Sequence, residues 1–148
     1  MKRIVSVTAI AIAAMMLIVV VAARGHTRTA AISSTLVVTA QATSFNTAGN
    51  GLGAVTTFTD NLYSHGHKVG RDQVMCVATG PGSYLECLGT DLLANGQVES
   101  IGSFDPVHQT RVDVGIAGGT GAYSDARGTI DVKVLSQTKS TYTYHFDR

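Results

Sequence analysis

Residues 118–128 read GGTGAYSDARG, and they lead directly into the alternating run TIDVKVL at residues 129–135. Glycines surround a single aromatic residue, Tyr123, in this stretch. Glycine tolerates positive φ and the close approach of another backbone, so the spacing predicts a tight turn and a β-bulge that feed a strand. A phosphate-binding loop would instead need a helix and a Lys-Ser/Thr pair after the last glycine. The stretch therefore favours a β protein over a nucleotide-binding protein.

Strand patterns recur at short spacing after residue 34, and no segment of helical period competes with them once the first 23 residues are set aside. The connections are short and rich in Gly, Asn, Pro and Ser, which makes consecutive strands antiparallel neighbours. Eight such strands close most simply into a barrel, with a two-sheet sandwich as the alternative. The predicted strands are residues 34–44, 54–63, 70–79, 84–93, 97–104, 111–117, 127–135 and 139–147.

The glycine-rich stretch resembles the Gly-Gly-Thr-Gly-x-aromatic-x-x-Ala-Arg-Gly signature of dirigent proteins and, more loosely, the matching segment of allene oxide cyclases. A second block, FTDNLY at residues 58–63, is followed by VG at 69–70 and MCV at 75–77 in the order that both families have. The resemblance covers most of the chain after residue 35. It implies an all-β fold, an eight-stranded antiparallel β-barrel of calycin-like shape, whose cavity guides ring closure or radical coupling. It also implies a homo-oligomer, a trimer in both families.

The N-terminus has the pattern of an export signal. Lys2 and Arg3 precede an uncharged, mainly apolar run from residue 4 to 23. We predict a signal peptide over residues 1–23, with an uncleaved membrane anchor as the alternative, then a flexible segment over 24–33 and one barrel domain over 34–148. The protein is thus expected to be secreted, and the short basic start is compatible with a bacterial exporter. Removal of Lys2 and Arg3 changes the 11 basic and 10 acidic residues to 9 and 10. Such a near-neutral balance argues against a nucleic-acid partner.

The two cysteines, Cys76 and Cys87, flank a strong turn signal, GPGS at residues 80–83. A hairpin centred on this turn places the two cysteines directly opposite each other, at a distance that a disulfide can bridge. Export would place them where disulfides persist. We therefore predict a cross-strand Cys76–Cys87 bridge, and a pair of free buried thiols is the alternative.

Asp60 is the first candidate for chemistry. Alternation in its strand puts Phe58, Asp60 and Leu62 on the same, apolar face, which would point the carboxyl into the barrel. A carboxyl held there needs a partner or has a raised pKa that suits it to proton transfer. The resemblance agrees, because the dirigent aspartate in the matching motif lines the pocket. The alternative is an aspartate that caps a turn or pairs with an arginine. Phe58, Leu62 and Phe104 are expected to contact a ligand or to pack in the barrel.

Arg127 is a second catalytic candidate because it matches the arginine of the dirigent Ala-Arg-Gly motif. Alternation along residues 126–134 instead puts it on the outer face, where it would bind carbonyls of the glycine turn. The allene oxide cyclase comparison places Cys76 on a pocket cysteine, but the essential first-strand glutamate is absent. Gln41 or Thr39 stands in that region, so the sequence does not support that family's own reaction.

The sequence leaves two functions open. One is an isomerase or cyclase that works without a cofactor, in which the barrel folds a small apolar substrate and Asp60 moves a proton. The other is an exported barrel that binds a small hydrophobic molecule without reaction. We expect no metal, because His65-Gly66-His67 has the pattern of a hairpin turn and lacks the further ligands of a metal site.

Overall fold

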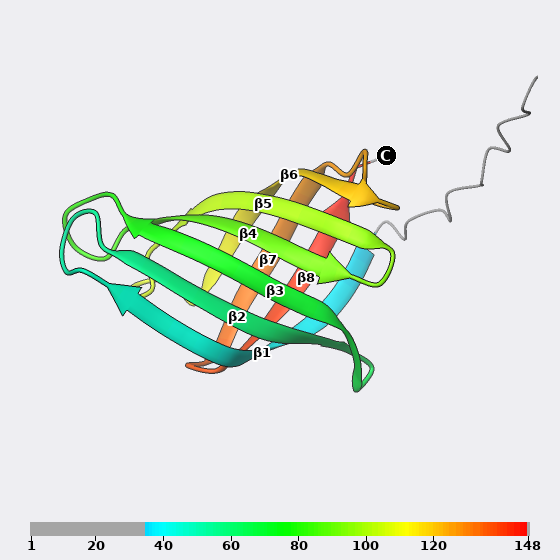
Figure 1. The fold of residues 1–148 in the computed structure, drawn as a ribbon, viewed down its shortest axis with the longest axis horizontal. Coiled ribbons are helices and arrows are strands. Elements are labelled where there is room, and N and C mark those ends of the chain that lie inside the picture. The colour runs from blue at the N-terminus through cyan, green and yellow to red at the C-terminus, as the bar shows by residue number, and fades with distance from the viewer. Residues whose placement is uncertain (1–34, 148) are drawn as a thin grey trace, which may run out of the picture.

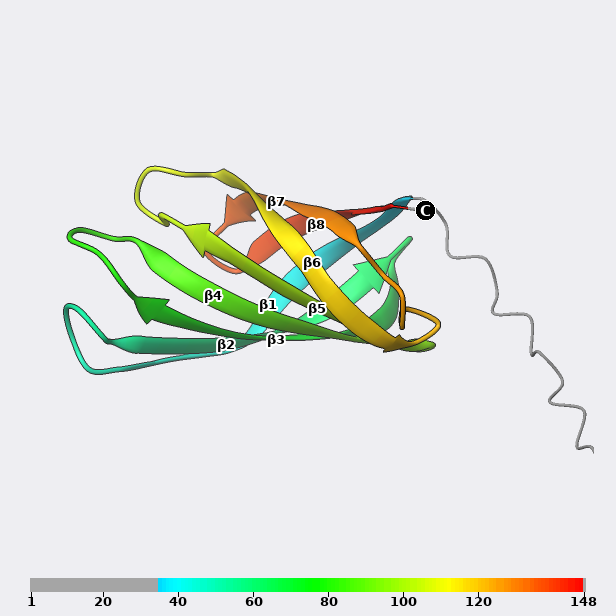
Figure 2. The same cartoon turned by 90° about the horizontal axis from the view of Figure 1, so that it is seen from above.

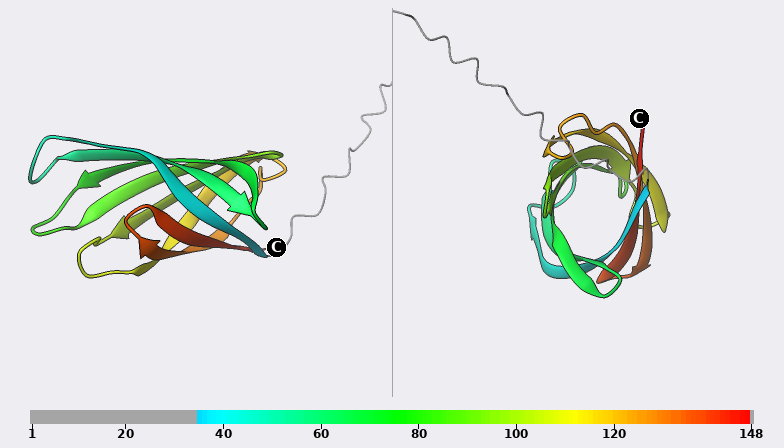
Figure 3. Two further views of the ribbon diagram at one scale, coloured as in Figure 1. Left: turned by 90° about the horizontal axis from the view of Figure 1, so that it is seen from below. Right: turned by 90° about the vertical axis from the view of Figure 1, so that its right-hand side faces the viewer.

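The computed structural model describes residues 35–147, which form eight strands in a closed antiparallel barrel. Each strand pairs with its neighbours in sequence, and the last strand pairs with the first, so the ring has no free edge (Figure 3). The predicted barrel is confirmed, and the alternative of a two-sheet sandwich is wrong. The strands are β1 (Thr35–Ala48), β2 (Val55–Ser64), β3 (His67–Ala78), β4 (Leu85–Leu93), β5 (Gly96–Phe104), β6 (Arg111–Gly121), β7 (Gly128–Ser136) and β8 (Lys139–Phe146).

One difference from the predicted strands lies at the end of β6. This strand was expected to stop at residue 117, with the turn at 118–121, but it continues to Gly121. A bulge occurs in β6 just before the glycines, because Glu99 and Ser100 of β5 face Gly118 and Ile116, which leaves residue 117 unpaired. The expected leader and flexible segment lie outside the described residues. No helix in residues 35–147 is long and apolar enough to cross a bilayer.

The glycine-rich stretch closes one end of the barrel. After β6 the chain turns and brings Tyr123 against Phe146 of β8, with ring centroids 5.7 Å apart. Gly128 then starts β7 with a φ of 124°, and a Cβ atom at this position would overlap the carbonyl oxygen of His145. Only glycine fits where these two backbones meet, which accounts for the conspicuous spacing of glycines.

The packed core occupies the same half of the barrel as this turn. Its buried side chains come from every strand except β3 and β4, which add partly buried ones. Leu62, Val98 and Tyr144 are fully buried in it. The members are Val38, Ala40, Leu62, Val98, Ile116, Ala126, Ile130, Tyr142, Tyr144 and Phe146.

The opposite end carries the loops between β1 and β2, β3 and β4, and β5 and β6, seen at the left of Figure 1 and again in Figure 2. The C-terminus lies at the packed end. The fold therefore separates a packed, stabilising half from a half that is free to bind a ligand.

Candidate active site

A cavity of about 890 Å³ occupies the half of the barrel that the core leaves free. This volume is in the range of sites for small molecules. Its walls are inward-facing side chains, mostly apolar, from all eight strands. Those that define its shape are Phe58, Val74, Phe104, Val112, Val114 and Val132. Gly89 and Gly102 also face the cavity and widen it, because they add no side chain.

The floor of the cavity contains a row of three aspartates on adjacent strands. Asp60 of β2 lies opposite Asp72 of β3, and Asp72 lies opposite Asp91 of β4. All three line the cavity, although they are only 6%, 2% and 3% exposed. Ionised carboxylates are rarely buried unless they are paired. Three neighbouring buried carboxyls therefore need hydrogen-bond partners or retained protons, which makes this row a candidate functional site.

Tyr142 of β8 reaches across the barrel to this row. Its hydroxyl lies 2.9 Å from Oδ2 of Asp72 and 3.2 Å from Oδ2 of Asp60, within hydrogen-bond distance of both. The other oxygen of Asp60, Oδ1, is buried without a hydrogen-bond partner, and so is Oδ1 of Asp91. The hydroxyl of Tyr144, buried beside Asp91, also makes no hydrogen bond, so the floor holds three buried polar atoms without a partner.

Burial raises the pKa of every carboxyl in the row. Asp72 has its pKa raised to about 8, first by burial and then by the charge of Asp91. The pKa of Asp91 is raised to about 7, again mainly by burial. The pKa of Asp60 is raised by burial, and the hydrogen bond from Tyr142 opposes that rise. Near neutral pH the row therefore holds protons that ordinary aspartates would have lost.

Cys76 and Cys87 form the predicted disulfide, which lies in the cavity wall between β3 and β4. Their Cα atoms are 4.0 Å apart. The same register aligns Asp72 with Asp91, four residues further from the loop on each strand. Because Cys76 is oxidised, it offers no free thiol to a ligand.

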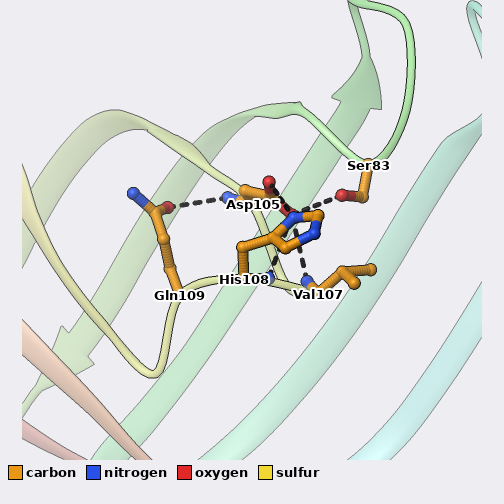
Figure 4. Close-up of polar contacts among 5 residues, drawn as sticks. All are labelled: Ser83, Asp105, Val107, His108 and Gln109. Atoms are coloured by element: carbon orange, nitrogen blue, oxygen red, sulfur yellow. Dashed lines mark hydrogen bonds and ion pairs between the residues drawn. The ribbon is translucent and has the colours of Figure 1, made fainter.

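The rim of the cavity is held by a network of hydrogen bonds around Asp105 (Figure 4). Asp105, after β5, accepts hydrogen bonds from Ser83 in the β3–β4 loop and from the backbone N–H groups of Val107 and His108. His108 Nδ1 lies 2.8 Å from the other carboxyl oxygen. These bonds, that of Ser83 foremost, lower the pKa of Asp105 to about 2. The rim loops are thus tied to each other beside Gln109, which lines the mouth.

The structure brings three of the residues predicted from sequence to the cavity: Asp60, Phe58 and Phe104. Leu62 faces inward as expected, but it lies one step further along β2 and packs in the core. Gln41 is exposed, because Ala40 and Ala42 on either side of it take the inward positions.

Arg127 does not join Asp60. It is exposed beside the glycine-rich turn, and its guanidinium donates a 2.7 Å hydrogen bond to the carbonyl of Ala126. This position agrees with the outer face that alternation predicted.

Sequence reasoning did not identify Asp72, Asp91 or the hydroxyl of Tyr142 as site residues. A signal for the pair was present, because Asp72 and Asp91 are equally distant from the GPGS turn, as the two cysteines are. Nothing comparable pointed to Tyr142, which comes from a distant strand. Within residues 35–147 no group of three or more His, Cys, Asp and Glu side chains is arranged to hold a metal ion.

No protein-family model matches the sequence, and no curated protein matches it. Solved structures do match. A pyocyanin demethylase superposes with a TM-score of 0.68 and 22% identity, over 76% of this chain and 99% of its own. A pterocarpan synthase dirigent protein gives 0.63 and 18% identity, over 76% and 84%. An exo-specific intermolecular Diels-Alderase gives 0.59 and 17% identity, over 76% and 97%. The chain therefore has the barrel fold found in dirigent proteins and Diels-Alderases, as its motifs implied.

Proposed function

We propose that the barrel binds a small, largely apolar substrate and promotes its cyclisation or isomerisation by proton transfer from the aspartate row. The observation that carries this proposal is the hydrogen-bonded set of Asp60, Tyr142 and Asp72 on the floor of an apolar-walled cavity. Solved structures with this fold include a pterocarpan synthase dirigent protein and a Diels-Alderase, which supports ring-forming chemistry. The disulfide and the predicted export signal are compatible with action outside the cytoplasm.

The row can hold an acid and a base at the same time. A single phenolic proton cannot be donated fully to both Asp60 and Asp72. Since burial raises the pKa of Asp72 to about 8, we assign a retained proton to Asp72, whose O–H then donates to the Tyr142 oxygen. Tyr142 in turn donates to an ionised Asp60. This order lets Asp60 accept a proton from the substrate while a neutral carboxyl remains to return one.

The walls contribute by restricting the substrate. A ring closure needs a flexible chain to hold its reacting atoms close together, and a shaped apolar cavity lowers the entropic part of that barrier. Such catalysis needs few ionisable groups. The aspartate row is also the only set of carboxyls among the described residues that line this cavity.

Proton transfer can be tested with a reporter before the substrate is known. 5-Nitrobenzisoxazole opens to a coloured cyanophenolate when a base removes its ring C–H proton and the N–O bond breaks. We expect Asp60→Asn to lower the opening rate by about 100-fold or more, the usual effect of a positioned general base. Asp125→Asn, at an exposed carboxyl in the turn before β7, should keep the rate of the unmodified protein. Equal rates for the Asp60 variant and the unmodified protein would refute the catalytic part.

A second function, binding without reaction, is favoured by the position of the other candidate groups. Gln41 and Arg127 both lie outside the cavity, so the chemistry rests on the aspartate row alone. Native mass spectrometry of the secreted protein would distinguish the two functions. A stoichiometric, unaltered apolar molecule retained through purification supports binding, and a substrate consumed only when Asp60 is intact supports catalysis.

A further inference from the structure

The floor of the cavity has fewer hydrogen-bond donors than acceptors. Each of the three aspartates has two carboxyl oxygens, whereas the neighbouring side chains supply two hydroxyls, that of Tyr142 between Asp60 and Asp72 and that of Tyr144 beside Asp91. Oδ1 of Asp60 and Oδ1 of Asp91 have no partner, although both side chains are more than nine-tenths buried. A buried acceptor left without a donor costs about 1 to 3 kcal/mol. The natural source of the missing donors is a molecule bound in the cavity.

The floor also lacks positive charge. Among the described residues that line the cavity, the only basic side chain is Lys139. It is the first residue of β8, exposed at the turn that β8 shares with β7, whereas Tyr142 lies further along the strand. Arg111 is bound to Asp131 outside the cavity. The negative charge of the row, when it ionises, therefore has no cation from the barrel wall to balance it.

We propose that the substrate carries a donor-rich, positively charged nitrogen group, such as a protonated amine, an amidine or a protonated nitrogen heterocycle, that sits on Asp60 and Asp91. This inference rests on the proposed function and specifies its substrate class. The apolar body of the substrate then contacts the aliphatic and aromatic walls above the row. Carboxyl groups rotate easily about their last torsion, so each unpaired oxygen can turn toward the bound group. A metal ion fits less well, because the described residues form no cluster arranged to hold one.

Matched fluorescent probes test the head group separately from the body. 1-Pyrenemethylamine, 1-pyrenemethanol and 1-pyrenecarboxylate have the same aromatic body and carry an ammonium, a neutral hydroxyl and a carboxylate. Titration at pH 7.5, followed by fluorescence anisotropy, should show the ammonium probe binding about tenfold or more tightly than the alcohol, with the carboxylate weakest. The factor corresponds to one charge-assisted hydrogen bond.

Variants separate the aspartate row from the protein surface. Asp60→Asn and Asp91→Asn should each reduce the preference for ammonium over alcohol, whereas Asp125→Asn should leave it unchanged. Val114→Trp, which fills the cavity from β6, should weaken binding of all three probes. Equal affinities, preference for the carboxylate, or no binding of any probe would overturn the proposed substrate class.

The two proposals fail in different ways. If the alcohol binds as tightly as the amine while Asp60→Asn still abolishes benzisoxazole opening, the proton-transfer function stands and the charged substrate is wrong. If the ammonium preference depends on the row while the unmodified protein opens benzisoxazole no faster than Asp60→Asn, the ligand class stands and the catalytic function is wrong.

Discussion

Replacement of Asp72 by Asn should change how stability depends on pH. In the unfolded chain this carboxyl loses its proton near pH 3.8, whereas in the folded protein its pKa is about 8. Between these values the folded state keeps a proton that the unfolded state releases, so the free energy of unfolding falls as pH rises. At about 1.4 kcal/mol per pH unit, the loss from this group is on the order of 5 kcal/mol by pH 8. Asp91 adds a loss of the same sign, because its pKa is also raised.

At low pH the slope reverses. The pKa values of Asp105 and Asp131 are lowered, the first mainly by Ser83 and the second by Arg111. Their contribution is present above the unfolded pKa and is lost as pH falls through the folded value. Stability should therefore be greatest near pH 4 to 5, between the two opposing effects.

Urea unfolding at pH 5, 6, 7 and 8 would measure the effect of Asp72→Asn. Asn keeps the shape and offers an amide N–H in place of the carboxyl O–H that donates to Tyr142, but it does not titrate. The stability of the variant should fall less steeply as pH rises, by up to about 1.4 kcal/mol per pH unit. At pH 8 the variant should therefore be more stable than the unmodified protein. Asp125→Asn serves as the exposed control. Parallel curves for the Asp72 variant and the unmodified protein would refute the assignment of a retained proton to Asp72.

Three further changes test other parts of the barrel. Replacing both Cys76 and Cys87 by Ala should lower the free energy of unfolding by about 2 to 3 kcal/mol, since the bridge closes a short loop, and reductant should then have no effect in a denaturation experiment. Tyr142→Phe removes the hydrogen bond that lowers the pKa of Asp60, so the pH midpoint of benzisoxazole opening should move upward; an unchanged midpoint contradicts the relay. Gly128→Ala should cost roughly 3 kcal/mol or more by thermal or urea unfolding, whereas Gly53→Ala, where φ is also positive but the space is open, should cost only about 1 to 2; equal losses would contradict the proposed backbone clash.

Most of the fold could be predicted because it is local. The strands are joined by hairpins whose turn residues stand out in the sequence, and the turn at His65 and Gly66 has the positive φ values of a two-residue hairpin. The GPGS turn gave the Cys76–Cys87 pair by the same logic. The same pairing rule, applied to the other inward-facing residues of that hairpin, also predicts that Asp72 lies opposite Asp91.

The candidate site was harder to predict because it depends on how far the core extends. Alternation predicts that Leu62 and Asp60 lie on the same inward face. It does not predict that the packed core includes Leu62 and ends before Asp60, which lines the cavity. Gln41 was chosen by comparison with a family whose first strand carries a glutamate, and here the alternation of β1 turns it outward. Tyr142 could be found only once the ring closes and brings β8 across from β2 and β3.

The order of the strands has a consequence for folding. The aspartate row belongs to β2, β3 and β4, which two consecutive hairpins join, so the row can form within one continuous segment. The hydroxyl that binds it comes from β8, 82 residues after Asp60 and 70 after Asp72. Contacts over such separations pay a larger loop-closure entropy and form late. We therefore expect the three aspartates to align before the Tyr142 hydroxyl contacts them. Pairing of β8 with β1 then completes the site. In a chain that is cleaved before β8, or in which β8 is exchanged with another copy, the three aspartates would stay aligned but would lose the Tyr142 hydroxyl of their own chain.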